Sequence, residues 1–207
     1  MKKVLFQVAF LLLAVSVGSP ALAGHVYAVV PVAGPNSNAL AINRSGDVTG
    51  VFRTLGGADH AFLYTQANGF LDLGTLAGGN SIGRDINDLR VVVGQSDGRA
   101  FKWEQSTGMV GLNVGSSDAR SVTNLGTNTF GTVNGPSSTS TIWSNTNFPS
   151  PLFITENTEG YGINDFGEIV GRVDGTTGYY SSYSNVSYTD LGLFFPTILI
   201  TAAWRLP

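Results

Sequence analysis

Apolar and polar residues alternate in short segments along this chain. Val, Ile, Leu and aromatic residues recur throughout in runs of a few residues, and clusters of Gly, Asn, Ser and Asp interrupt them. No stretch places apolar residues at helical spacing over several turns. Short apolar segments bounded by turn residues are typical of strands. The pattern predicts an all-β protein, and its apolar content argues against disorder.

The same local pattern occurs four times. In each copy an asparagine is followed seven residues later by a glycine, and successive copies are offset by 44, 37 and 40 residues. The residues before the asparagine and five after it are β-branched in every copy, which predicts strand at both places. The four segments, aligned without gaps, are residues 42–50, 86–94, 123–131 and 163–171.

A tight turn explains the asparagine. Its side chain can accept a hydrogen bond from the backbone two residues further on, and a glycine three residues later can adopt positive φ. The pairs with this spacing are Asn43 with Gly46 and Asn164 with Gly167. Asn87 lacks the glycine and Asn124 has it one place early, as Gly126, so we expect the turn type to vary.

A second half-motif follows each first one. Residues 60–64 (HAFLY) are matched by residues 99–103 (RAFKW), and a glycine seven residues after each Phe opens another apolar strand. The later copies are looser, with residues 141–143 and 178–180 in the corresponding places and residues 190–192 echoing residues 72–74. Each unit is therefore expected to hold three or four antiparallel strands in a meander.

Units of this size predict a propeller-like arrangement of about four blades, in a ring that need not be complete. The expected units are residues 39–79, 80–115, 116–157 and 158–192. We expect the amino-terminal strand to complete the last blade. The repeated glycines are expected at the crowded inner part of each blade, where backbones approach closely; they are Gly50, Gly94, Gly131 and Gly171.

The two ends of the chain differ from the repeats. Residues 1–23 combine Lys2 and Lys3, a short apolar run and an A-x-A exit, which predicts a secretory signal peptide and an exported protein. The domain that remains, residues 24–192, is long enough to bury a core without cross-links. Residues 193–207 diverge from the repeat, and their apolar run is too short for a membrane span, so no span is expected in the mature chain.

Charge and cysteine content exclude several classes of function. The net charge of −3 falls to −5 once the two lysines of the signal peptide are removed, and Lys102 is then the only lysine. Scattered arginines without clustered lysines argue against a nucleic-acid partner. The chain has no cysteine, so disulfides, thiolate metal sites and thiol nucleophiles are excluded.

The repeat resembles a known family. The pattern I-N-x-x-G-x-V-x-G at residues 42–50, the HAFLY segment and D-L-G-T-L-x-G-G at residues 72–79 are similar to the extracellular HAF repeat family, whose tripeptide is His60-Ala61-Phe62 here. The match is strongest over residues 39–79. It is fair over residues 80–115 and 161–192 and weak between them. The resemblance implies a secreted or surface bacterial protein with propeller-like β repeats, and it transfers no activity or catalytic residues.

Candidate metal and acid–base residues are few. His25 and His60 are the only histidines, and the counterpart of His60 is Arg99, so His60 is expected to be a structural, solvent-facing residue. Two turns supply oxygens at short spacing for calcium, but the same residues are explained as turn formers; they are Asn43, Ser45 and Asp47, and Asn164, Asp165 and Glu168. We therefore assign no metal, cofactor-binding or catalytic residue.

Two further sets of residues were weighed for a carbohydrate ligand. Carboxylates that could form a glycosidase pair are Asp85, Asp88, Glu104, Asp118 and Glu156, but the sequence selects no pair among them. Aromatic residues that could stack on sugars, but are better explained as packing between blades, are Phe62, Tyr64, Phe101, Trp103, Trp143, Tyr179 and Tyr180. Nucleotide-binding, zinc-protease and nucleophile-elbow motifs are absent from the sequence.

These observations favour a non-catalytic surface or matrix interaction module without a cofactor, with an extracellular protein or glycan as its ligand. The alternative is a carbohydrate-active enzyme or lectin on a propeller-like scaffold. Convergent carboxylates about 5 to 10 Å apart would favour the enzyme. The sequence leaves the ligand, the closure of the ring and the oligomeric state open.

Overall fold

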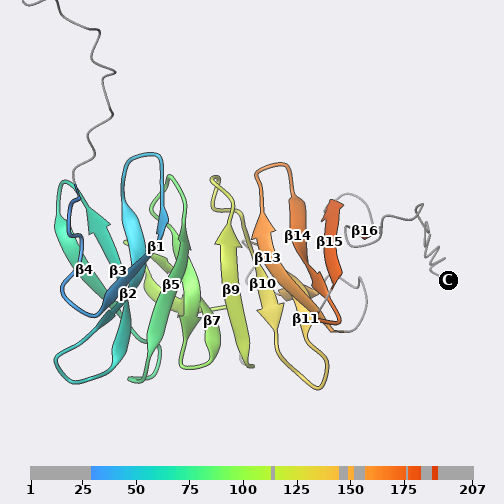
Figure 1. Ribbon diagram of the computed structural model, residues 1–207, viewed down its shortest axis with the longest axis horizontal. Coiled ribbons are helices and arrows are strands. Elements are labelled where there is room, and N and C mark those ends of the chain that lie inside the picture. Colours follow the sequence, from blue (N-terminus) through green and yellow to red (C-terminus); the bar gives the residue numbers. More distant parts are fainter. Residues whose placement is uncertain are drawn as a thin grey trace, which may run out of the picture. The chain divides into compact units, whose positions relative to one another are not determined.

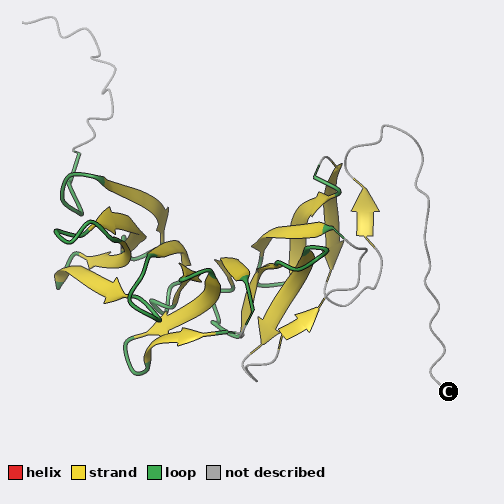
Figure 2. Ribbon diagram, turned by 90° about the horizontal axis from the view of Figure 1, so that it is seen from below, coloured by secondary structure: helices red, strands yellow, loops and turns green. Residues whose placement is uncertain are grey.

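The computed structural model describes residues 29–112, 115–144, 149–151, 157–175, 177–182 and 188–190. Within them the chain forms sixteen strands and no helix (Figures 1 and 2). The expected signal peptide, residues 191–192 and the divergent residues 193–207 lie outside the described residues. No helix of the described part is long and apolar enough to cross a membrane.

The strands form four separate four-stranded sheets. Sheet 1 contains β1 (Ser37–Ile42), β2 (Val48–Arg53), β3 (Asp59–Thr65) and β4 (Gly69–Gly74). Sheet 2 contains β5 (Ser81–Ile86), β6 (Val92–Ser96), β7 (Arg99–Glu104) and β8 (Gly108–Gly111). Sheet 3 contains β9 (Ser117–Val122), β10 (Asn128–Val133), β11 (Thr139–Ser144) and β12 (Pro149–Pro151). Sheet 4 contains β13 (Thr158–Ile163), β14 (Glu168–Val173), β15 (Thr177–Ser182) and β16 (Tyr188–Asp190).

Each sheet is an antiparallel meander whose strands pair in chain order, which confirms the expected all-β class and the expected hairpins. The HAFLY and RAFKW segments form strands, as expected, and lie in β3 and β7. The described sheets are open, and no closed barrel is found among them. In sheet 4 the fourth strand is β16, so the expectation that the amino-terminal strand completes this sheet is wrong.

The asparagine turn joins the first two strands of each sheet. Asn43 Oδ1 accepts from the N–H groups of Ser45 at 3.0 Å and Asp47 at 2.9 Å, and Gly46 has φ 78°. Asn87 forms the same two bonds although it lacks the glycine, because Arg90 itself adopts φ 64°. The expected change of turn type is therefore wrong for the second copy.

The third copy differs in another way. Thr123, rather than Asn124, follows the first strand directly, and its hydroxyl accepts from the N–H of Asn128 at 3.2 Å. Val122 pairs with Thr129, seven residues later, whereas Ile42 pairs with Val48, six residues later, so the turn is one residue longer than the turn between β1 and β2. The gap-free alignment is therefore wrong by one residue here, and Thr123 lies in the turn instead of the expected strand.

The repeated glycines lie opposite β-bulges. In each sheet the register between the first two strands shifts by one residue beside the glycine. A Cβ atom on Gly94 would overlap the carbonyl oxygen of Ile82 in the neighbouring strand, and the other three glycines have an equivalent clash. The expected close backbone approach is thus present, and it occurs between the first two strands of one sheet.

Successive sheets pack face to face. We call the side of each sheet that bears the repeated glycine its glycine face, and the other side its reverse face. The reverse face of one sheet covers the glycine face of the next and encloses an apolar cluster at each junction. Sheet 1 contributes Ala61, Leu63 and Leu73 to the first cluster, where they meet Val92, Phe101 and Trp103. Sheets 2 and 3 enclose Val93, Ala100, Ala119 and Trp143, and sheets 3 and 4 enclose Phe130, Ile142, Ile169 and Tyr179.

Hydrogen bonds between successive asparagine turns reinforce this packing. The backbone N–H of Arg44 donates to Asp88 Oδ1 at 3.0 Å, and the N–H of Asp88 donates to Asn124 Oδ1 at 3.4 Å. The N–H of Asn124 donates to Asp165 Oδ1 at 2.6 Å. We call this series the turn ladder. In addition, Asn87 Nδ2 donates to the carbonyl oxygen of Thr123 at 2.9 Å.

A second set of bonds joins the sheets at the start of each first strand. Ser81 Oγ accepts from the N–H of Ala61, Ser117 Oγ accepts from the N–H of Ala100, and Thr158 Oγ1 accepts from the N–H of Ser140, each at 2.8 Å. We call these bonds the hydroxyl bridges. Because the three accepting residues are buried, each bridge satisfies an N–H that water cannot reach.

Gly94→Ala tests the close approach at the bulge. The added methyl group has no space beside the Ile82 carbonyl, so we expect the free energy of unfolding to fall by about 2 kcal/mol. Gly34→Ala is the control, because nothing lies within 4 Å of a Cβ at that position. Urea unfolding followed by fluorescence measures both variants, and equal stabilities would contradict this account.

Asn87→Asp tests the bond from the second turn to the third. The substitution keeps both acceptor bonds within the turn but replaces the buried Nδ2 donor by an oxygen facing the Thr123 carbonyl. We expect a loss of about 2 kcal/mol at neutral pH. Asn38→Asp, at an exposed position of β1, is the matched control and is expected to change stability by less than about 0.5 kcal/mol in thermal unfolding. A similar loss in both variants would show that the charge, rather than the lost donor, matters.

Candidate functional site

The bulges bring one residue from each first strand into a row. The bulged residues are Leu40, Arg84, Arg120 and Tyr161, and we call them the bulge row. Strands β1, β5, β9 and β13 lie side by side in that order (Figure 1), so the four bulges follow one another across the sheets. A bulge redirects its side chain out of the regular pleat. All four side chains are partly exposed, from 30% for Arg120 to 42% for Leu40.

Charges of alternating sign lie along the row. Arg84 Nε is 2.6 Å from Asp118 Oδ1, and Arg120 Nε is 3.1 Å from the other oxygen of the same carboxylate. Glu159 Oε1 is 2.6 Å from Arg172 Nη2, and this bond holds the pKa of Glu159 below its ordinary value. The network fixes the guanidinium groups of the row.

The ring of Tyr161 contacts two of these cations. The guanidinium carbon of Arg120 is 4.9 Å from the centre of its ring, and that of Arg172 is 5.9 Å away. The hydroxyl of Tyr161 donates to Glu159 at 3.2 Å. An exposed ring held by cation–π contacts and by a hydrogen bond from its hydroxyl is a preorganised contact surface.

Asp85 is a half-buried acid beside the row. Its Oδ2 accepts from the N–H of Val122 in the next sheet at 2.9 Å, and its Oδ1 accepts from the N–H of Ile86 at 2.9 Å. Burial raises the pKa of the Asp85 carboxyl, and hydrogen bonds from Val122, Ile86 and Ser121 offset only part of that effect. This carboxylate joins two sheets.

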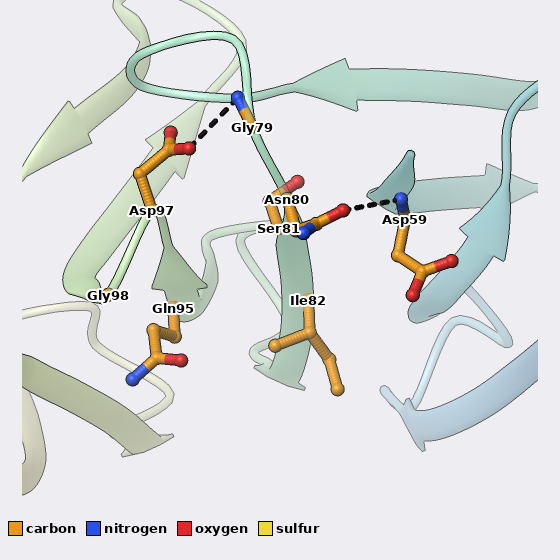
Figure 3. Close-up of a pocket in the computed structure, with 8 residues that line it drawn as sticks. All are labelled: Asp59, Gly79, Asn80, Ser81, Ile82, Gln95, Asp97 and Gly98. Carbon is orange, nitrogen blue, oxygen red and sulfur yellow. Dashed lines mark hydrogen bonds between the residues drawn. The ribbon is translucent and has the colours of Figure 1, made fainter. Parts of the chain in front are cut away.

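A pocket of about 530 Å³ lies where sheets 1 and 2 meet. Figure 3 shows two of its polar groups bonded to backbone: Asp97 accepts from the N–H of Gly79 at 2.9 Å, and Asn80 Oδ1 accepts from the N–H of Asp59 at 2.9 Å. Gln95 Nε2 donates to the Ser117 carbonyl at 3.0 Å. Its lining residues are Asp59, Gly79, Asn80, Ser81, Ile82, Gln95, Asp97 and Gly98.

The described carboxylates that were weighed for a glycosidase pair each have a partner. Asp85 and Asp118 bond as given above. Asp88 accepts from Arg44 in the turn ladder, and Glu104 Oε1 is 2.6 Å from Lys102 Nζ. Glu156 lies outside the described residues. The structure therefore joins these acids to basic residues or backbone N–H groups.

The carboxylates considered as calcium ligands accept hydrogen bonds. Asp47 Oδ2 accepts from Asn43 Nδ2 at 2.9 Å and from Arg90 Nε at 2.8 Å. Glu168 Oε1 accepts from the hydroxyl of Tyr180 at 2.7 Å, and Glu168 Oε2 accepts from Asn164 Nδ2 at 2.6 Å. Among the described residues no group of three or more His, Asp or Glu side chains is placed to hold a metal ion.

His60 pairs with an acid at the edge of sheet 1. Its Nδ1 lies 2.9 Å from Asp72 Oδ1, and its ring meets Phe52 edge to face with centroids 6.1 Å apart. Asp72 also accepts from the N–H of Gly74 at 2.8 Å, which holds the carboxylate in place. His25 lies outside the described residues.

Most of the repeated aromatic residues pack between sheets, as expected. Phe101 and Trp103 fill the first junction, Trp143 the second and Tyr179 the third. Burial raises the pKa of Tyr179 to about 12, and its hydroxyl donates to Ser140 at 2.6 Å. The exceptions are partly exposed Tyr64 and Tyr180, and Phe62, which belongs to the glycine face of sheet 1.

The bulge row was not predicted from the sequence, although a signal for it exists. Each bulged residue follows a small residue, which in turn lies two places after a Ser or Thr. The four instances are Ser37-x-Ala39-Leu40, Ser81-x-Gly83-Arg84, Ser117-x-Ala119-Arg120 and Thr158-x-Gly160-Tyr161. The Ser or Thr forms the hydroxyl bridge in the last three. The small residue leaves room for the preceding sheet at Gly83 and Gly160.

Comparison with known family models and with curated proteins finds no match for this chain. The resemblance to the HAF repeats therefore stays an expectation that rests on the repeated residues.

Asp85→Asn tests the electrostatic role of the half-buried acid. The pKa of Asp85 is higher in the folded chain than in the unfolded chain. Its contribution to the free energy of unfolding is therefore fully present at low pH and is lost as pH rises through the folded pKa. The amide carries no charge and keeps an oxygen for Val122. We expect the variant to gain stability over wild type as pH rises from about 3 to 7. Urea unfolding across this range measures the difference, and a difference independent of pH would contradict the assignment.

Proposed function

We propose that this chain is an exported, non-catalytic interaction module, a propeller-like series of β units that presents the bulge row to an extracellular ligand. One observation carries the proposal. The row occupies a structurally equivalent position in all four sheets, yet its residues differ in chemistry, from aliphatic Leu40 through two arginines to Tyr161. Repeat proteins bind extended ligands through such variable positions on a constant scaffold.

The surrounding residues support binding rather than catalysis. Asp118 and Glu159 are ion-paired to arginines, and Asp85 bonds backbone of two strands. A glycosidase needs one carboxyl free to donate a proton and a second free to attack or activate water. The acids near the row instead hold its arginines and join the sheets. The export signal expected in residues 1–23 supports an extracellular ligand.

The pocket between sheets 1 and 2 favours a lectin as a second candidate. Asp59, Asn80 and Gln95 bring a carboxylate and two amides to one hollow, and such groups hydrogen-bond to sugar hydroxyls. The bulge row and this pocket share no residue, so substitutions in one or the other distinguish the interaction module from the lectin.

The test is binding of the purified protein to a panel of immobilised acidic and neutral polysaccharides and extracellular matrix proteins. We expect Tyr161→Ala to weaken binding about tenfold or more, because exposed aromatic residues dominate contact energy. The control is Leu125→Ala, at an exposed turn residue outside the row and the pocket. Release of new reducing ends from a bound polysaccharide would identify an enzyme and contradict the proposal. A loss of polysaccharide binding in Gln95→Ala but not in Tyr161→Ala would select the pocket lectin.

A further inference from the structure

The glycine face of sheet 1 lacks the cover that the other three glycine faces have. Ile42 at the end of β1 is 69% exposed, whereas Ile86, its equivalent in β5, is 5% exposed. Ser37 is exposed, whereas Ser81, Ser117 and Thr158, its equivalents, are buried in hydroxyl bridges to the preceding sheet. The difference arises because no described sheet precedes sheet 1. Sheet 1 therefore has the residues that form a junction in the other sheets, but no described sheet packs against them.

The uncovered face carries a cluster of aromatic rings beside the pair of His60 and Asp72. Phe52 and Phe70 meet edge to face with ring centroids 4.8 Å apart, and Phe62 stacks on Phe70 at 5.5 Å. Phe70 remains 41% exposed. Phe62 itself is buried, and the exposed part of the face is formed by Phe70, Ile42 and partly exposed Tyr64. Trp103, the equivalent of Tyr64 in sheet 2, is buried in the junction with the reverse face of sheet 1. Exposed large apolar side chains grouped in this way are typical of a contact surface.

The reverse face of sheet 4 has the matching half of the junction. Val170 and Gly178 occupy the places of Val93 and Ala100 in sheet 2. Val170 is 44% exposed, whereas Val93 is buried against Ala119 in the junction between sheets 2 and 3. Ala39 is the residue of sheet 1 in the place of Ala119. The same pair of side chains is therefore available for one more junction.

Polar residues elsewhere on this reverse face are compatible with such a junction. Arg172 and Tyr180 stand in the places of Gln95 and Lys102. The sheet that carries Gln95 and Lys102 already packs against sheet 3. Polar residues at these two positions therefore do not prevent stacking.

The turns at the two ends carry opposite charges. Asp165 accepts from Asn124 at the last described step of the turn ladder, and Arg44 stands at the equivalent position of the first turn. The side chain of Arg44 is 83% exposed, with its Nη1 3.5 Å from Asp88. One more step of the ladder would place Arg44 beside Asp165. Because Arg44 has no acceptor oxygen, an ion pair would replace the ladder bond at that step.

We propose that the glycine face of sheet 1 binds the reverse face of sheet 4 of a second copy of this chain, head to tail. The contact repeats the existing junctions: Ala39 against Val170, Ser37 as acceptor for the N–H of Gly178, and Arg44 beside Asp165. Within the described residues the apolar clusters lie between sheets 1 and 2, sheets 2 and 3, and sheets 3 and 4, and none joins sheet 4 to sheet 1. We therefore assign the covering face to another molecule. A heterologous contact of this kind produces a ring or a filament.

The experiment uses two variants, one in each face. Ile42→Asp places a carboxylate on the glycine face of sheet 1, and Val170→Asp places one on the reverse face of sheet 4. Both residues are exposed in the single chain, so folding is retained. We expect wild type to self-associate with concentration in sedimentation-velocity runs, and each variant alone to associate about tenfold or more weakly. Leu125→Asp, at a turn residue that is 71% exposed, is the matched control and is expected to associate like wild type.

Mixing the two variants gives the decisive result. Ile42→Asp retains an intact sheet 4 and Val170→Asp retains an intact sheet 1, so an equimolar mixture is expected to form a dimer that neither variant forms alone. A wild-type protein that stays monomeric at every concentration would overturn the proposal and indicate closure within one chain. A mixture that stays monomeric while wild type associates would also overturn it, because contact between two identical faces is not restored by mixing.

Discussion

The structure depends on the hydrogen bonds by which one turn orders the next. The side chain of Asn87 accepts from its own turn and donates to the backbone of the following turn, so one residue fixes both the local turn and the spacing between sheets. A four-stranded meander exposes two faces and cannot bury both by itself. Packing of apolar faces supplies the stabilisation, and the turn ladder and hydroxyl bridges determine the register in which the faces meet.

This division of roles leaves the bulged position free to vary. Close contacts require a glycine opposite each bulge and a small residue just before the bulged residue. The hydroxyl bridge requires a Ser or Thr at the start of the strand. At the bulged position itself, the side chains of Leu40 and Tyr161 are partly exposed, and no contact between sheets requires a particular residue type there. A constant backbone thus carries a variable surface, which is the physical basis of the binding role proposed above.

The sequence predicted the class of fold, the hairpins and the packing of Phe101, Trp143 and Tyr179, because β-branched and aromatic residues recur with the strands. It did not predict that Arg90 would adopt positive φ without a glycine, since the bonds made by Asn87 stabilise that conformation. Thr123 was assigned to a strand because the gap-free alignment placed it in a column of β-branched residues. In the structure its hydroxyl accepts the hydrogen bond that closes the turn, as the asparagine side chain does in other copies. The bulge row was missed because a bulge is a property of strand pairing rather than of one strand.

The connections between the second and third strands differ in length from sheet to sheet. Five residues join β2 to β3, whereas Asp97 and Gly98 alone join β6 to β7. In sheets 2 and 3 these connections also bond to the next sheet, because the carbonyl oxygen of Gly98 accepts from the N–H of Ser117 at 3.0 Å and that of Ser138 accepts from the N–H of Thr158 at 2.9 Å. The bonds of the β2–β3 connection close within itself, where the N–H of Thr54 donates to Ala58 and the N–H of Gly57 donates to Thr54. A change in the length of the β2–β3 connection therefore leaves the contacts between sheets in place, whereas a change in the β6–β7 or β10–β11 connection would break a bond to the next sheet. The tip of the β2–β3 hairpin is therefore the suitable place to graft a foreign peptide.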